Sequence, residues 1–519
     1  MKKPLSIIGS LFFVGVISVI ISWEIISWDF ADGPSSIPIT TRSEQARQYF
    51  LKGRDLSERL RILEACDYFE KAVAEDPQFA YACLYLSLLH PNIKMRLNFL
   101  IRAEELADGV SEGERLLILA AKAFTNRQPL EQRRLREQVV QLYPDDARAH
   151  NELGNALYWQ KDWTGAIEQY LIAVKLDPSF SQSYNGLGYC YRFVGDLITA
   201  EKYFLKYVQL LPDDPNPYDS YADLLSEMGR HEEAISYYRK AIEMRPDFMN
   251  ANLGMSWNYC ALGKYSKAID QLSMFCKATS DDSRRRMALF GMAVTYADEG
   301  NLEQASSALK SACEIDKATG DQPALSEDLG RLGLILLEAG RPDDASRVFS
   351  ASLQAVQDMP GTPKIVIENA QLDHMRNTAL VWLTRGDLAT SFDFARRLLE
   401  VAQAGPDPTR AQQAHQTLGL IELSSGNLNK AIEELNQSDV SEAYTQYHLA
   451  RAYEAAGNFG QALKYYRLAS TYDQFNPLTQ ALVRKQAKAG VGSLMLVKRE
   501  TMTETASADS SSTLTTDRP

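Results

Sequence analysis

The chain has 519 residues, of which 45% are hydrophobic, 24% charged and 10% aromatic. This composition is that of a folded protein with a core, and it excludes a globally disordered, collagen-like or disulfide-scaffold chain. The formal net charge of −12 argues against a nucleic-acid partner, because phosphate binding requires clustered lysine and arginine. At about 100 to 200 residues per domain, the length suggests three or four globular domains.

The first element is an uncharged segment, Leu5–Trp23. A helix of this length rises about 1.5 Å per residue and just spans a bilayer core of about 30 Å. We expect residues 1–30 to form an uncleaved membrane anchor, with a cleaved signal peptide or a buried soluble helix as alternatives. Lys2 and Lys3 precede the segment, so that the positive-inside rule predicts a periplasmic or exterior body. Residues 31–42 are typical of a linker because they contain glycine and two prolines.

Four columns of residues recur with a spacing of 34 in the middle of the chain. They are Pro144, Pro178, Pro212 and Pro246; Ala166, Ala200, Ala234 and Ala268; Tyr170, Phe204, Tyr238 and Leu272; and Leu153-Gly154, Leu187-Gly188 and Tyr221-Ala222. Independent columns that keep one spacing indicate a repeat architecture, so the chain is expected to form one array rather than several ordinary domains.

Each repeat has the pattern of two helices. Apolar residues at helical spacing lie between Ala147 and Gln160 and again between Trp163 and Leu176. The proline column ends the second helix, because proline has no N–H and disfavours helix at the preceding residue. Five residues before the alanine column, a glycine is expected to end the first helix in the left-handed conformation. This glycine occurs at Gly195, Gly229, Gly263, Gly300, Gly340, Gly426 and Gly457.

The small residues of each repeat have an expected packing role. The glycine or alanine of the first helix should face the alanine of the second, while the aromatic residue fills the space beside the next repeat. This pattern resembles the tetratricopeptide repeat family at Leu153, Gly154, Leu157, Ala166, Tyr170, Ala173 and Pro178. The resemblance implies an all-α fold, a right-handed α-solenoid of helix-turn-helix repeats, here preceded by the predicted transmembrane helix.

The array is expected to span residues 43–476 as about twelve helix pairs, most regular over 147–278. The spacing loosens between 280 and 410, which predicts longer helices or longer connections there. The sequence of the first repeat resembles the start of repeat arrays in bacterial transcription regulators and kinases, which implies a bacterial source. Residues 477–490 are expected to form a polar capping helix over the last repeat, followed by a disordered Ser/Thr-rich tail at 491–519.

Motifs for catalysis or cofactor binding do not stand out. The chain contains no phosphate-binding glycine loop, no His-Glu-x-x-His and no Gly-x-Ser-x-Gly, so no enzyme activity and no cofactor is predicted. The histidines fall in different repeats and no Cys-x-x-Cys pair occurs, which disfavours a metal site. The cysteines are expected to be buried thiols, with Cys260 and Cys276 the first pair to test for a disulfide. The basic run at 284–286 is expected to be a solvated loop, with a small anion-binding patch as the alternative.

The resemblance also implies a concave groove lined by the first helix of each repeat. Carried over from the family pattern, the candidate peptide-binding residues are Asn151, Asn155, Tyr158, Asn185, Tyr189, Arg192, Asp219, Asp223, Ser226, Asn250 and Trp257. Asparagine amides can pair with the backbone of an extended peptide, and the aromatic residues offer amphipathic contact area. Two aspartates make the basic clamp that some family members use for chaperone tails doubtful. The alternative is a solvated inner surface that binds nothing.

The predicted function is a membrane-tethered scaffold or adaptor that binds a protein or peptide partner in this groove, in the bacterial cell envelope. A signalling, sensor or regulatory subunit that acts through a separate effector chain is the alternative. No small-molecule substrate is expected. The predicted location is the inner membrane, with a single pass and a periplasmic repeat body, or the periplasm or exterior after cleavage.

Overall fold

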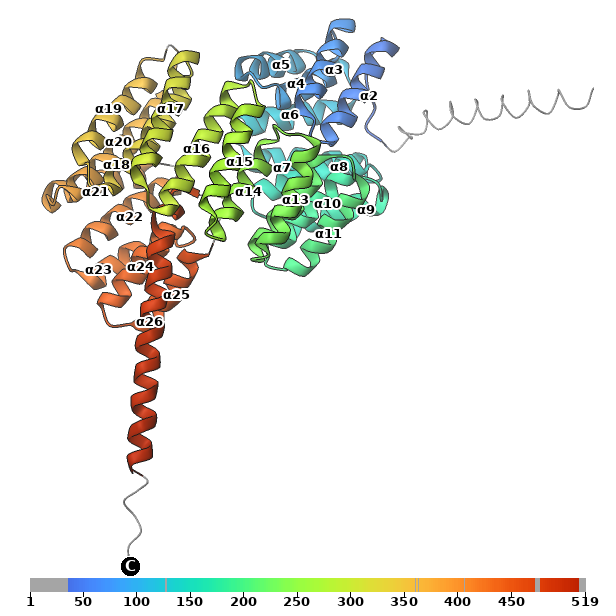
Figure 1. Ribbon diagram of the computed structural model, residues 1–519. Helices are drawn as coiled ribbons and strands as arrows, with labels where there is room; N and C mark the ends of the chain where they lie inside the picture. The colour runs from blue at the N-terminus through green and yellow to red at the C-terminus, as the bar shows by residue number, and fades with distance from the viewer. Residues whose placement is uncertain are drawn as a thin grey trace, which may run out of the picture. The chain divides into compact units, whose positions relative to one another are not determined.

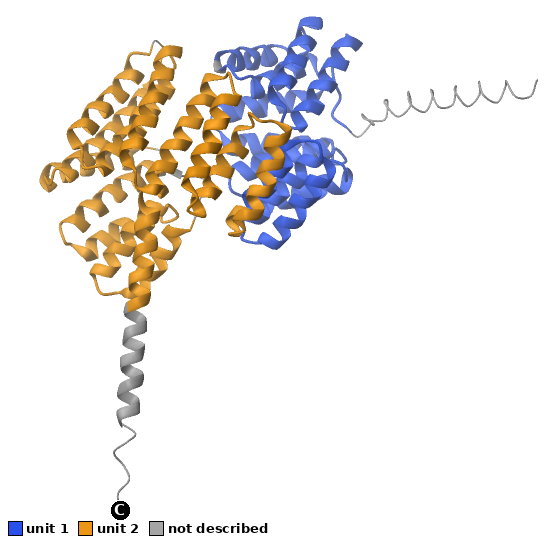
Figure 2. Cartoon of the chain, in the orientation of Figure 1, with its two compact units in different colours: residues 1–224 blue, residues 225–519 orange. Residues whose placement is uncertain are grey.

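The computed structural model describes residues 36–512, except 127, 360, 363, 406 and 472–476, and these residues contain helices and no strand (Figure 1). Consecutive helices pack against one another as hairpins, so the predicted all-helical repeat fold is confirmed. The chain forms two compact units, residues 1–224 and 225–519 (Figure 2). The boundary falls within one helix of a regular repeat, and nothing in the repeat spacing indicates it.

The helices of unit 1 are α2 (Glu44–Glu58), α3 (Ile62–Glu75), α4 (Ala80–Leu89), α5 (Ile93–Glu105), the short 3-10 helix η1 (Ala107–Gly109), α6 (Glu112–Thr125), α7 (Pro129–Leu142), α8 (Ala147–Trp159), α9 (Trp163–Leu176), α10 (Ser181–Phe193), α11 (Leu197–Leu210) and the first part of α12 (Pro215–Glu227). The helices of unit 2 are α13 (His231–Met244), α14 (Met249–Ala261), α15 (Tyr265–Ala278), α16 (Asp282–Glu299), α17 (Leu302–Thr319), α18 (Gln322–Glu338), α19 (Pro342–Gln357), α20 (Lys364–Thr384), α21 (Leu388–Ala404), α22 (Pro408–Ser424), α23 (Leu428–Asn436), α24 (Ala443–Ala455), α25 (Phe459–Ser470) and α26 (Pro477–Ser512).

Helix length explains the loosened spacing after residue 280. The helices α16 to α22 have 16 to 21 residues each. The helices α8 to α15 have only 13 or 14 residues. Of the two explanations that the sequence left open, longer helices account for most of the extra residues.

Capping residues set where the paired helices begin and end. Asp162 accepts a hydrogen bond from the N–H of Gly165 at 3.1 Å at the start of α9, which satisfies a donor that the helix leaves free. All seven glycines predicted to end a first helix have positive φ, for example +85° at Gly195. The equivalent position before α9 is Lys161, with φ +61°, a conformation that costs free energy for any residue with a Cβ.

The structure corrects the expected neighbour of the small residue on the first helix. A Cβ on Gly154 would lie 2.7 Å from the ring of Tyr170, which is the aromatic residue of the same repeat. A Cβ on Gly186, from the following repeat, would lie 2.6 Å from that ring. The ring therefore packs between its own first helix and the next one. Glycine is needed at these two positions because the aromatic ring lies so close to both helices that it leaves no room for a Cβ.

Residues 36–42 lie against unit 1 instead of forming a free linker. Ile37 is 5% exposed, and its N–H donates to a carboxylate oxygen of Asp146 at 2.8 Å. The N–H of Thr40 donates to the carboxylate of Glu114 on α6 at 2.9 Å. These long-range bonds make the described part of the predicted linker a component of the folded unit, whereas residues 31–35 lie outside the described residues.

The C-terminal helix α26 differs from the predicted cap in length and in position. It continues to Ser512, beyond Gly490 where the prediction ended it and into the segment predicted to be disordered. Besides α25 and α24 of the last repeat, it packs against α16, far back in the array (Figure 1). The buried guanidinium of Arg484 forms an ion pair with Asp298 and donates to the carbonyl oxygen of Cys260 at 2.9 Å. The helix thus joins the last repeat to an earlier part of unit 2, and Arg484, one of the basic residues expected in a solvated cap, is buried.

The predicted location in a membrane is corrected. None of the helices described between residues 36 and 512 combines the length and the apolar character that crossing a bilayer requires. The segment Leu5–Trp23, on which the prediction of a single pass and a periplasmic body depended, lies outside the described residues. Within the described part of the chain, no element supports that location.

Candidate functional site

Unit 1 contains a cavity of about 610 Å³ lined mainly by the first helices of its repeats. A smaller cavity of about 220 Å³ adjoins it and shares several of its lining residues. Four of the predicted groove residues line the larger cavity: Asn155, Tyr158, Asn185 and Tyr189. They come from α8 and α10, where residues three or four apart face the same side of a helix.

The asparagines of α8 are engaged within the protein. Asn151 is 2% exposed, and its side chain donates to Gln182 at 3.3 Å and accepts from the hydroxyl of Ser183 at 2.9 Å. The side-chain oxygen of Asn155 accepts a hydrogen bond from the hydroxyl of Tyr170 at 2.8 Å. Asn151 therefore links α8 to α10, and a peptide could use only the remaining amide group of Asn155.

On α10 the side-chain oxygen of Asn185, unlike those of Asn151 and Asn155, accepts no hydrogen bond from the described residues. This Oδ1 is buried and has no hydrogen-bond partner among the described residues, which is costly for a polar atom unless a ligand or water satisfies it. Tyr189, one turn further, meets the ring of Phe204 edge to face at 5.1 Å, and burial raises the pKa of its hydroxyl. Arg192 is buried, with its guanidinium 5.9 Å from the Tyr189 ring, and it lies outside the residues that line the cavity.

The remaining predicted groove residues are not brought into this cavity. Asp219 and Asp223 lie on α12 and do not line it. Ser226, Asn250 and Trp257 belong to unit 2, where the hydroxyl of Ser226 donates to Asn258 at 3.0 Å. Asn250 is exposed, while the Trp257 ring packs against the hydrophobic cluster that includes Phe290. Four of the eleven predicted residues therefore line this cavity of unit 1, and the role of the others in a groove stays a prediction.

Sequence reasoning missed the residues that give the cavity its apolar and charged character. Leu60, Phe124 and Trp159 line it and are 41%, 49% and 75% exposed, an unusual group of large apolar side chains on one surface. Arg136, from α7, forms an ion pair with Glu152, yet its buried Nε has no partner among the described residues. These residues lie on second helices, at helix ends or in turns, outside the positions that the family pattern assigns to the groove, so no repeat column would have identified them.

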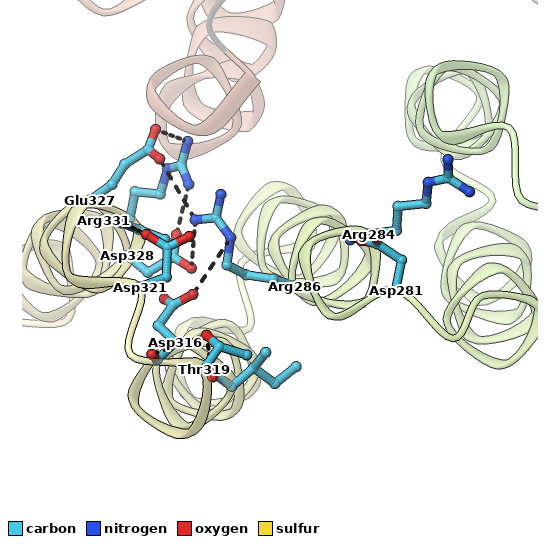
Figure 3. A network of polar contacts seen from close by, with 11 residues as sticks. Asp281, Arg284, Arg286, Asp316, Thr319, Asp321, Glu327, Asp328 and Arg331 are labelled. Atoms are coloured by element: carbon cyan, nitrogen blue, oxygen red, sulfur yellow. Dashed lines mark hydrogen bonds and ion pairs between the residues drawn. The ribbon is translucent and has the colours of Figure 1, made fainter. Parts of the chain in front are cut away.

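The basic run at residues 284–286 is the first turn of α16 and not a solvated loop. The carboxylate of Asp281 caps this helix, accepting from the N–H of Arg284 at 2.8 Å. The guanidinium of Arg286 lies 3.2 Å from Asp328 and 3.7 Å from Asp316, two almost fully buried carboxylates (Figure 3). The run therefore starts a helix and supplies a structural ion-pair network, and the arginine in that network is already neutralised.

The thiols and the metal-binding side chains of the described residues form neither a disulfide nor a metal-binding group. All six cysteines are free in the structure, including Cys260 and Cys276, and burial raises the pKa of Cys260 to about 12. Such a thiol stays protonated and unreactive near neutral pH. Among the residues described between 36 and 512, no three His, Cys, Asp or Glu side chains gather as they would to hold a metal ion.

Solved structures similar to this chain share short stretches of it. The crystal structure of MamA has 21% identity and a TM-score of 0.28, and the match covers 31% of this chain and 93% of that one. The structure titled YrrB, a TPR protein with an unusual peptide-binding site, has 21% identity and a TM-score of 0.27, over 35% of this chain and 92% of that one. A search of curated proteins gives no match.

Family models match the repeats themselves. Models described as tetratricopeptide repeat match residues 179–247, 225–289, 288–319 and 447–478, and one described as TPR repeat matches residues 154–192. The matched ranges include the helix pairs in which the 34-residue columns occur and the last pair, α24 and α25. Together with the glycine caps and the packing of glycine on aromatic rings, these matches show that the chain contains tetratricopeptide repeats.

Proposed function

We propose that this protein is a scaffold or adaptor whose repeats, a right-handed α-solenoid over residues 43–476, bind a protein partner through an extended peptide segment. The peptide would lie in the unit 1 cavity, against Asn155, Tyr158, Asn185 and Tyr189. The observation that carries the proposal is the buried Asn185 Oδ1 without a partner beside this cavity. A backbone N–H of a bound peptide would supply the missing hydrogen bond.

The apolar surface of the cavity determines what kind of peptide would fit. Leu60, Phe124 and Trp159 would accept apolar side chains, because covering them removes a large apolar area from water. Arg136 is paired with Glu152, so the cavity has no strong excess of one charge. We therefore expect a segment with alternating apolar side chains and little net charge.

The test uses the full chain and a displayed library of random peptides. A selected peptide is measured by fluorescence anisotropy against wild type, Asn185→Ala and the matched control Asn250→Ala, which changes an exposed asparagine on α14 of unit 2. Loss of one hydrogen bond, about 0.5 to 1.5 kcal/mol, predicts a roughly two- to twelvefold weaker complex for Asn185→Ala only. Trp159→Ala should weaken binding by about tenfold without loss of stability, because the side chain is 75% exposed. Selection of no peptide above a blank surface, or equal binding by all variants, would refute the proposal.

A further inference from the structure

A second cavity, of about 490 Å³, lies within unit 2. Its walls come from α18, α20, α22 and α24, and α26 contributes Thr479 and Leu482. The position of α26 across the array therefore completes a partly enclosed space. Binding sites for small organic molecules are typically about 300 to 1,000 Å³ and are enclosed in this way.

Two arginines line this cavity and form no ion pair with a described carboxylate, although burial raises the pKa of Glu338 on α18 and the charge of Arg451 opposes that rise. Neither Arg376 on α20 nor Arg451 on α24 forms an ion pair with a carboxylate that the structure describes. Arg376 donates from Nη2 to the side-chain oxygen of Gln416 at 2.9 Å, but its Nε is buried with no acceptor among the described residues. Arg451 lies with its guanidinium 5.9 Å from the ring of Tyr447. In contrast, Arg484 and Arg286 of the same unit are paired with acids. A buried guanidinium N–H without an acceptor, as at Nε of Arg376, is a group that an anion would satisfy.

A neutral histidine lies on the same wall. His448 is 9% exposed, packs against the ring of Tyr444 at 4.6 Å, and its Nδ1 has no partner among the described residues. Burial and the nearby Arg451 lower the pKa of His448 to about 3. The imidazole is therefore uncharged near neutral pH and can exchange a hydrogen bond with a ligand without adding charge.

The other lining residues restrict the kind of anion. Glu338, Asp439 and Glu442 also line the cavity, so each negative charge on a ligand beyond the one held by the two arginines adds repulsion from these acids. The apolar part of the lining is made of leucines: Leu334, Leu337, Leu380, Leu383, Leu420 and Leu423. A ligand that covers these leucines must have a hydrocarbon part, because burying apolar surface away from water is what favours its binding.

We propose that the unit 2 cavity binds a small amphipathic monocarboxylate, with its carboxylate between Arg376 and Arg451 and its hydrocarbon part on the leucines. The tetratricopeptide repeat pattern places first helices along a groove, but it assigns neither of these arginines nor the contribution of α26, which follows the last repeat. The site is independent of the peptide cavity of unit 1, so that either one can fail without the other.

The test compares three probes of equal chain length on the full protein by isothermal titration calorimetry: octanoate, octylammonium and octanol. Octanoate is expected to bind at least about tenfold more tightly than the other two, as a charge-assisted hydrogen bond to arginine predicts. Equal binding of the three probes, or no binding of octanoate, would overturn the proposal.

Two variants locate the site. Arg376→Gln and Arg451→Gln should each weaken octanoate binding by about ten- to hundredfold, while octanol binding stays as in wild type. Arg396→Gln, which changes an arginine on α21 that is 64% exposed and lies outside the cavity, is the matched control. Arg451 is exposed, lies near the Tyr447 ring and acts on Glu338 and His448 through its charge, so its variant is expected to keep the fold and to report on the site even if Arg376→Gln destabilises unit 2. If the folded Arg451→Gln protein bound octanoate with the same affinity as the control variant, the assignment of the site would be contradicted.

Discussion

Replacing either of two glycines of the same helix by alanine should change the free energy of unfolding in opposite directions. Gly330 and Gly333 both lie in α18, one turn apart. A Cβ on Gly330 meets nothing within 4 Å, whereas a Cβ on Gly333 would overlap the ring of Phe349, which is 2% exposed on α19. The two positions therefore separate the helical preference of alanine from the close contact between paired helices.

The expected magnitudes follow from these contacts. Gly330→Ala should raise the free energy of unfolding by about 0.5 to 1 kcal/mol, since alanine loses less backbone entropy than glycine in a helix. Gly333→Ala gains the same amount but forces Phe349 or the backbone to move, which costs about 1 to 3 kcal/mol in a packed core. The difference between the two variants removes the helical contribution and measures the overlap alone, about 1 to 3 kcal/mol.

Urea unfolding followed by circular dichroism gives the comparison, and hydrogen exchange of α18 amides checks it locally, because repeat arrays can unfold in parts. Adding Phe349→Leu should restore part of the stability of Gly333→Ala but not of the Gly330→Ala protein, a coupling that a double-mutant cycle detects. If Gly333→Ala proved as stable as Gly330→Ala, the packing of glycine on the aromatic ring would not be what requires glycine at this position.

Three further changes test the caps, the returning helix and the buried acids. Lys161→Gly should stabilise the protein by about 1 kcal/mol in urea unfolding, because it removes a left-handed residue that has a Cβ; a loss of stability would contradict this. Arg484→Ala leaves its acidic partner buried and unpaired and should cost about 3 to 5 kcal/mol, against about 0.5 kcal/mol or less for the exposed neighbour in Lys485→Ala; similar unfolding midpoints would show that α26 does not close unit 2. Burial next to Asp328 raises the pKa of Asp316 to about 7, so the folded chain holds a proton that the unfolded chain has lost, and stability should fall as pH rises from about 4 to 7. Asp316→Asn should flatten this fall in midpoints measured across that range, and an unchanged slope would exclude Asp316 as its source.

The candidate sites show where reasoning from repeat columns stops. The columns place Asn155, Asn185 and Tyr189 on the faces of helices that line the unit 1 cavity. They do not show that the side chain of Asn151 already accepts a hydrogen bond from Ser183. A hydrogen bond between neighbouring repeats depends on side-chain distances, which cannot be calculated from the repeat spacing. The arginines of the unit 2 cavity have no column at all, and become neighbours only because α20, α24 and α26 meet in space.

The sequence by itself determined the local structure and the type of repeat. The spacing of 34, the prolines that stop helices and the glycines that cap them are effects within a few residues, so the helix pairs and the tetratricopeptide repeat could be predicted from them. Only the tertiary structure decided the division into two units, the docking of residues 36–42, and the return of α26 to α16. The docking and the return join parts of the chain that are distant in sequence, for example Arg484 and Asp298. Such contacts depend on how small differences between successive repeats add up along the array.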